Sequence, residues 1–368
     1  MTTKRFPFTG VLPSRLFAAG VLLLLASSVA CVSHAATPMG WVTLPEIAPD
    51  GPVTVFYPTN AAEAPVPRGP FKPMLAADAT PVEGNRRLVV MSHGSGGSPW
   101  VHTDLARALV EAGFVVAMPW HRGDNTLDDA HPGPDSWALR PAEMSRAIDA
   151  VARDPRFAVR LDLDRVGIYG MSAGGHTALS MAGGRWSRAG FKRHCDAHLA
   201  EDFNTCVGLI TRLRGNALDA VKLAVARWVI DWRFADDTPQ AHHDPRVAAV
   251  AAAVPAAADF DMASLANPSV PLALFTSAGD RWLTPRFHGD RVLAACARCE
   301  HPVDLPTGGH GAWLSPAPPG LTGLVGDLLN DPPGFDRSVM AAANRTVAAF
   351  FTRHLTGPTP PDQRGRPM

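Results

Sequence analysis

One serine stands in a setting that suits a catalytic nucleophile. Ser172 lies in GIYGMSAGGHTAL, between Gly170 and Gly174, so that the sequence reads G-x-S-x-G. The apolar run RVGIY precedes it and a helix-like run follows it. A sharp strand-to-helix turn strains the backbone of its central residue, requires small neighbours and exposes the central hydroxyl beside a helix N-terminus. The pattern is weak by itself, but this position predicts that Ser172 is a nucleophile rather than only a turn residue.

A serine hydroxyl is a poor nucleophile at neutral pH, so it needs a base and a group that orients the base. Both are expected later in the chain, each at the carboxyl end of a strand. His310, in the stretch VDLPTGGHGAW, follows the last predicted strand and is the candidate base. Asp280, in PLALFTSAGDRWLTP, ends the strand before it and is the candidate acid. Asp259 and Asp261, in AAADFDM, end the preceding strand and remain alternatives for the acid.

A developing oxyanion needs two backbone N–H donors beside the nucleophile. Ala173, which begins the helix after the serine, offers one of them. The loop SHGSGG follows the strand RLVVM, and its glycines permit a close backbone approach, so the N–H of Ser95 is the candidate for the other. The loop lacks the G-K-[ST] ending of a phosphate-binding loop and the spacing of a dinucleotide fingerprint. These residues therefore predict an oxyanion hole formed by Ser95 and Ala173.

Alternating strands and helices must position these groups. Apolar strand-like runs such as VTVFYP, RLVVMSHG, VVAMPW and RVGIYG are separated by helical patterns such as HTDLARALVEAGF and PAEMSRAIDAVARDP. This alternation predicts an α/β domain over residues 36–357, with a mostly parallel central sheet and helices on both faces. Residues 185–244 interrupt the alternation, and we interpret them as a cap-like insertion over the carboxyl edge of the sheet. An extra packing helix, DAVKLAVARWVIDW, without substrate contact is the alternative, and residues 358–368 are expected to form a flexible tail.

Charge and the N-terminal sequence restrict the partners and the compartment. The chain of 368 residues has 34 basic and 34 acidic side chains and is 46% hydrophobic, which argues against a nucleic-acid surface and favours a small neutral or apolar partner. Basic residues precede the apolar run LFAAGVLLLLASSVA, and SHA follows it, so residues 1–35 are expected to be a signal peptide. The mature protein is then periplasmic or secreted and has no stable membrane span. An uncleaved anchor, or a lipid anchor at Cys31, is the alternative.

Four cysteines remain after removal of this signal peptide. An oxidising compartment favours disulfides, and sequence proximity favours the pairs Cys195–Cys206 and Cys296–Cys299. A zinc site is the alternative, but CARC is the only C-x-x-C motif, so no metal is expected.

These motifs resemble those of the α/β-hydrolase superfamily, and within it the bacterial predicted dienelactone hydrolases, which are related to platelet-activating-factor acetylhydrolases. The resemblance covers roughly Val53 to His354 and is carried by SHGSGG, GMSAGGHTAL, HCDAHLAEDFNTC, HDPRVAAVAAAVPA, AGDRWLTP and GGHGAWL. It implies an α/β-hydrolase fold with a cap or lid segment, and a serine hydrolase that cleaves small-molecule esters without a metal or organic cofactor.

The resemblance leaves the substrate and the acid open. Dienelactone hydrolases use a cysteine nucleophile, whereas this chain has Ser172, so that family name does not define the substrate. In the acetylhydrolase branch the acid follows the earlier strand, which keeps Asp259 and Asp261 as candidates beside Asp280. A peptidase or amidase with the same triad is a second reading. A catalytically silent binding module is a third, although such a module would normally have lost a triad residue.

Overall fold

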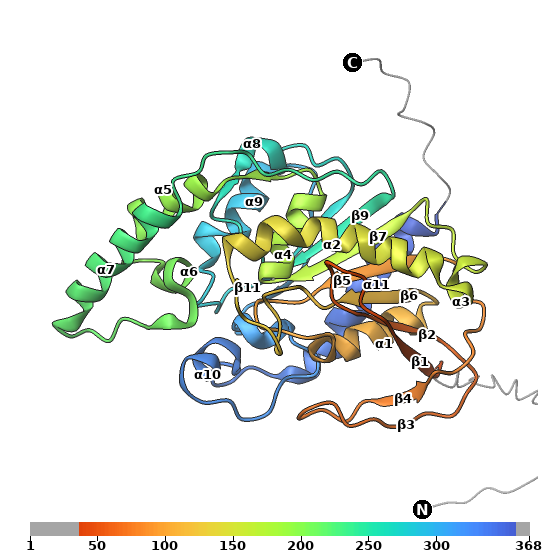
Figure 1. Cartoon of the computed structure of the whole chain (residues 1–368). Helices are drawn as coiled ribbons and strands as arrows, with labels where there is room; N and C mark the ends of the chain where they lie inside the picture. The colour runs from red at the N-terminus through yellow and green to blue at the C-terminus, as the bar shows by residue number, and fades with distance from the viewer. Residues whose placement is uncertain (1–36, 358–368) are drawn as a thin grey trace, which may run out of the picture. The chain divides into compact units, whose positions relative to one another are not determined.

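The computed structural model of the protein describes residues 37–357. The expected signal segment, 1–35, and the expected flexible tail, 358–368, lie outside the described residues. The secondary structure of residues 37–357 is organised around one large sheet (Figure 1).

That sheet has ten strands in the order β12-β11-β9-β7-β5-β6-β2-β1-β4-β3. The parallel part consists of β12 (Glu300–Leu305), β11 (Leu272–Ser277), β9 (Val247–Ala253), β7 (Val166–Met171), β5 (Leu88–Ser92) and β6 (Val115–Pro119). An antiparallel strand, β2 (Val53–Pro58), joins β6 to β1 (Met39–Leu44), and β4 (Met74–Ala77) and β3 (Ala64–Pro65) complete that edge. The predicted mostly parallel sheet is therefore confirmed.

Helices cover both faces of the inner parallel strands, which explains why β5, β6, β7 and β11 are buried along their whole length, whereas the edge strand β12 is largely exposed. In β5, Leu88 and Val90 pack into one hydrophobic core, and Val89 and Met91 pack into the other. The helices that contribute to the first core include α2 (Pro134–Arg153), α4 (Ala173–Met181) and α9 (Gly289–Ala295), and those of the second include α1 (Thr103–Glu111) and α11 (Met340–Leu355). The shorter helices are α3 (Pro155–Ala158), α8 (Met262–Leu265) and α10 (Gly323–Leu329).

The start of α2 differs from the sequence prediction. The pattern PAEMSRAIDAVARDP places a helix start at Pro141, but α2 begins at Pro134 and contains Pro141 in its interior. Proline at the first turn is favourable because its fixed φ angle suits a helix and its missing N–H has no partner there. The earlier start matters for the site because it adds Ser136 and Arg140 to the helix.

The interruption at residues 185–244 is mostly helical. It contains β8 (Arg185–Trp186), α5 (Arg188–His198), α6 (Phe203–Val207) and α7 (Leu218–Arg233). The three helices lie together at the left of Figure 1, and β8 pairs with β10 (Phe260–Asp261) in a separate two-stranded sheet. One side of α7 leaves large apolar side chains exposed, namely Leu218, Val221, Val225, Trp228 and Trp232. That residues 185–244 form a cap over the substrate stays a prediction.

None of the helices within residues 37–357 combines the length and the apolar character that crossing a bilayer requires.

Candidate active site

Ser172 sits at a strained turn between β7 and α4. Its φ and ψ angles are 60° and −119°, in a region that residues with a Cβ rarely adopt. The turn is held because the Ser172 N–H donates to the carbonyl of Ala253 over 3.0 Å. A Cβ on Gly170 would lie 1.9 Å from the carbonyl oxygen of Gly174, and a Cβ on Gly174 would lie 2.0 Å from that of Ser92. The glycines of G-x-S-x-G are thus required by the close approach of α4, β7 and β5.

The structure brings the predicted nucleophile, base and acid together. His310 Nε2 lies 2.9 Å from Ser172 Oγ, and His310 Nδ1 lies 2.7 Å from Asp280 Oδ2. The other carboxylate oxygen, Oδ1, accepts from the backbone N–H groups of Trp282 and Leu283 at 2.8 and 2.9 Å. An ionised carboxylate only accepts hydrogen bonds, so its contact places the imidazole proton on Nδ1 and leaves Nε2 free to accept from the serine hydroxyl.

The two alternative acids lie elsewhere. Asp259 Oδ2 is 3.1 Å from Nε2 of His176, a buried residue of α4. Asp261 is exposed, caps α8 by accepting from the N–H of Ala263 at 3.1 Å, and pairs with Arg185. Of the three aspartates, therefore, Asp280 is the one that contacts the imidazole of the candidate base.

The glycine-rich loop after β5 lies against the nucleophile. A Cβ on Gly94 would lie 3.3 Å from the Cβ of Ser172, which shows how closely the loop backbone approaches. The N–H groups of Ser95 and Ala173 donate to no other group within residues 37–357. Neither candidate oxyanion donor is therefore already used in a hydrogen bond within the described residues.

A cavity of about 350 Å³ adjoins the candidate base. It is lined on one side by His310, Arg281 and Trp282, and on the other by residues of α10 and the loop after it. A second cavity, of about 400 Å³, is lined by Trp41, Trp100 and other residues but by none of the three triad residues. Of the triad residues, the first cavity is lined by His310, whereas Ser172 and Asp280 are not among its lining residues.

The four cysteines of the described residues form two disulfides. Cys195 of α5 is bonded to Cys206 of α6, and Cys296 is bonded to Cys299 directly after α9. Since all four thiols are used in these bonds, they are not available as zinc ligands. Among the described residues, no group of three or more His, Cys, Asp and Glu side chains is arranged to hold a metal ion.

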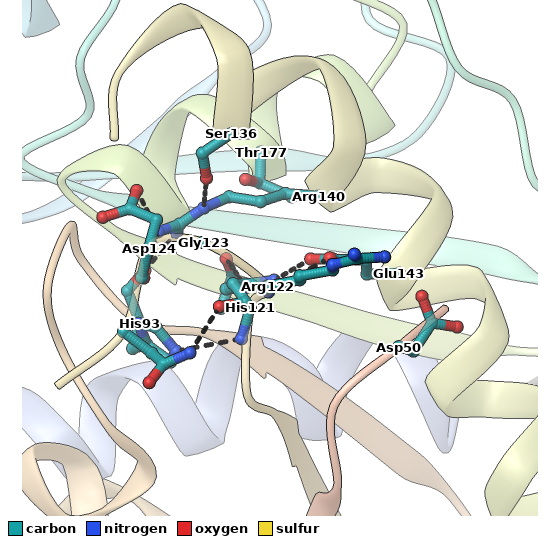
Figure 2. Close-up of polar contacts among 12 residues, drawn as sticks. Asp50, His93, His121, Arg122, Gly123, Asp124, Ser136, Arg140, Glu143 and Thr177 are labelled. Carbon is teal, nitrogen blue, oxygen red and sulfur yellow. Dashed lines mark hydrogen bonds and ion pairs between the residues drawn. The ribbon is translucent and has the colours of Figure 1, made fainter. Parts of the chain in front are cut away.

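A buried polar network that no sequence motif indicated lies behind the glycine-rich loop (Figure 2). Arg140, which has no exposed surface, pairs with Asp124 at 2.8 Å, and His121 lies between Ser92 and Glu143 at 2.7 and 2.5 Å. Burial lowers the pKa of His121 well below its ordinary value and raises the pKa of Glu143. For Glu143 a signal was present, because it occupies a position of the predicted helix on the face that otherwise carries buried apolar side chains.

The comparison with solved structures identifies the fold. A ferulic acid esterase from Streptomyces cinnamoneus superimposes with a TM-score of 0.55 at 19% sequence identity, covering 91% of this chain and 95% of that one. The strand order, the elbow at Ser172 and this similarity together define an α/β-hydrolase fold. No protein-family model matches the chain. No curated protein matches it by sequence either, so the resemblance to dienelactone hydrolases and acetylhydrolases stays a prediction.

Proposed function

We propose that the protein is a serine hydrolase that cleaves small-molecule carboxylic esters through an acyl-enzyme. The observation that carries this proposal is the hydrogen-bonded chain from Ser172 Oγ through His310 to Asp280, at a strained turn beside two N–H groups that have no acceptor within residues 37–357. Further support comes from the fold that the protein shares with a ferulic acid esterase.

In this proposal, Ser172 Oγ attacks the carbonyl carbon of the ester while its proton passes to Nε2 of His310. The carbonyl oxygen becomes an oxyanion that accepts from the N–H groups of Ser95 and Ala173. The imidazolium, stabilised by Asp280, then gives its proton to the leaving alcohol. Water attacks the resulting acyl-enzyme by the same route in reverse, releasing the acid and restoring the serine hydroxyl.

The proposal also includes export. Export is supported by the signal-peptide-like composition of residues 1–35 and by the two disulfides, which suit a periplasmic or extracellular protein. A lipid anchor at Cys31 stays the alternative for the mature N-terminus.

A fluorophosphonate probe tests the nucleophile. The expected result is one adduct, mapped by mass spectrometry to Ser172, and the loss of both labelling and ester turnover in Ser172→Ala. The chain supplies an internal control, because Ser92 also contacts a histidine that contacts a carboxylate, yet it has no exposed surface and should stay unlabelled. An adduct elsewhere, with turnover retained in Ser172→Ala, would contradict the assignment.

Substrate class is tested with matched leaving groups. A series of p-nitrophenyl esters should be hydrolysed with a kcat/KM far above that of aminoacyl p-nitroanilides. Preference for the anilides would favour the peptidase reading, and loss of all turnover despite Ser172 labelling would favour a binding module.

A further inference from the structure

The loop that carries Ser95 is attached to a buried ion pair. Arg140 donates through Nη2 to Asp124 Oδ2 at 2.8 Å, and neither side chain has any exposed surface (Figure 2). The same guanidinium donates through Nε to Ser136 Oγ at 2.8 Å and through Nη1 to the carbonyl oxygen of His93 at 2.6 Å. Arg140 therefore ties α2 to the residue at which the loop begins.

Asp124 holds the other side of the loop. Its second oxygen, Oδ1, accepts from Ser95 Oγ at 2.6 Å and from the N–H of Gly96 at 2.9 Å. Gly96 has a φ angle of 62°, a left-handed conformation that glycine adopts without strain. The backbone around the Ser95 N–H is thus held on both sides. Arg140 binds the carbonyl oxygen of His93, and Asp124 binds the hydroxyl of Ser95 and the N–H of Gly96.

The charges of this pair are maintained inside the protein. Burial alone would raise the pKa of Asp124, but the charge of Arg140 and hydrogen bonds from Ser95 and Gly96 outweigh it, so the pKa lies below its ordinary value. Buried ion pairs contribute little net stability, because desolvation offsets most of their attraction. The planar guanidinium donates several hydrogen bonds in a fixed geometry, so such a pair is better suited to orienting a loop than to adding to the free energy of unfolding.

We propose that Asp124 and Arg140 are positioning residues that hold the N–H of Ser95 at the distance and angle required for the oxyanion. This inference rests on the proposed esterase function and specifies how one half of its oxyanion hole is built. A preorganised donor assists only when the oxyanion forms, so loosening the loop should affect the transition state and not the binding of the substrate.

The sharpest test uses the exposed end of the network. Ser95→Ala removes the hydroxyl that reaches Asp124 but keeps the backbone N–H, and Ser95→Thr keeps a hydroxyl. Ser95 is exposed, so both variants are expected to fold. For Ser95→Ala we expect kcat on a p-nitrophenyl ester to fall by about 10-fold or more, up to the roughly 10²–10³-fold cost of losing one oxyanion donor. KM should not change, and Ser95→Thr should restore most of kcat.

The inhibition constant of a boronic acid is a second measurement, and replacing a residue with a merely structural role would not change it. The boronic acid adduct with Ser172 places an oxygen in the oxyanion hole, so the inhibition constant should rise by the same factor as kcat falls. Asp124→Asn should show the same pattern more strongly, and the double variant Asp124→Asn with Ser95→Ala should be no worse than Asp124→Asn, because both act through one contact. Arg146→Met is the control, since it removes an ion pair with Asp50 from the same helix without touching the loop.

The outcomes separate the inference from the proposed function. Unchanged kcat and boronic acid affinity in Ser95→Ala, in a wild-type protein that turns over esters at Ser172, would overturn the positioning role alone. A wild-type protein inert toward esters and unlabelled at Ser172 would overturn both. If Asp124→Asn fails to fold, the comparison of Ser95→Ala with Ser95→Thr still decides.

Discussion

At the scale of single residues, the site combines a locally unfavourable conformation with long-range hydrogen bonds that support it. Ser172 has a positive φ angle although it carries a side chain, and contacts from β9 and the surrounding glycines hold it there. Local preference and global fold disagree at this residue, which is common where a protein performs chemistry. The strain thus supports the proposed nucleophile independently of the hydrogen bond to His310.

Asp280 gives the residue-scale prediction. Asp280→Asn should lower kcat on the order of 10⁴-fold, because an amide no longer selects the imidazole tautomer that accepts from the serine. Steady-state kinetics on a p-nitrophenyl ester measures this loss. Asp261→Asn, at an exposed aspartate, is the control and should be nearly silent. A crippled Asp261→Asn or Asp259→Asn beside an active Asp280→Asn would show that the acid is misassigned.

The sequence anticipated these residues unequally. The juxtaposition of Ser172 and His310 could be predicted, because each lies in a glycine-rich stretch directly after a strand. Asp280 was the candidate acid from the sequence, but Asp259 and Asp261 stayed alternatives. Asp259 and Asp280 follow neighbouring strands, and only the three-dimensional arrangement shows which one contacts the imidazole. Asp124 and Arg140 were missed because a buried ion pair leaves no short motif.

At the scale of elements, the insertion is connected to the loop that holds the candidate acid. Asn204 and Thr205 of α6 donate to the carbonyl groups of Arg281 and Trp282 at 3.0 and 3.1 Å. These carbonyls directly follow Asp280 in the chain. The insertion could be predicted from the sequence, but this attachment could not, because its acceptors are backbone carbonyl groups, which have no signature in the side chains.

The disulfide between α5 and α6 tests this connection. Replacing Cys195 and Cys206 by serine removes a cross-link over a separation of 11 residues, which should destabilise the protein by roughly 2–3 kcal/mol. We expect a lower Tm and also a lower kcat, because α6 would hold the Asp280 loop less firmly. Thermal melts and ester kinetics measure both.

Serine replacements at Cys296 and Cys299 are the matched control. This bridge has a sequence separation of only 3, and its loss should change Tm less and leave kcat nearly unchanged. An unaltered kcat in the Cys195 and Cys206 variant would mean that the insertion and the acid loop are independent.

At the scale of the whole molecule, buried titratable groups link stability to pH. Asp202 of the insertion lies 2.8 Å from His194 Nε2 of α5 and 3.2 Å from His288 Nε2, next to α9. Burial alone would raise the pKa of Asp202, but the hydrogen bonds and charges of the two imidazoles outweigh it and lower the pKa well below its ordinary value. The insertion is thereby joined to α9 through one ionised carboxylate.

The sign of the pH effect follows from this lowered pKa. The contribution of Asp202 is fully present above the unfolded-state pKa of about 3.9 and is lost as the pH falls toward the folded-state value. At pH 6 the Tm of the wild-type protein should therefore be higher than that of Asp202→Asn, and this difference in Tm should shrink below about pH 4. Differential scanning fluorimetry measures it, with Asp261→Asn as an exposed control, and a difference independent of pH would contradict the linkage.

The sheet order has a consequence for the time at which activity can arise. The serine and the histidine of the candidate site are separated by 138 residues, and the histidine follows β12, the edge strand that comes last among the strands in the sequence. Contacts between such distant segments form slowly, because closing long loops costs entropy before any contact repays it. A nascent or unfolded chain therefore carries no activated serine, whatever part of the sheet has already formed. Hydrolytic activity at this site is therefore expected only in molecules in which β12, the last strand in the sequence, has joined the sheet.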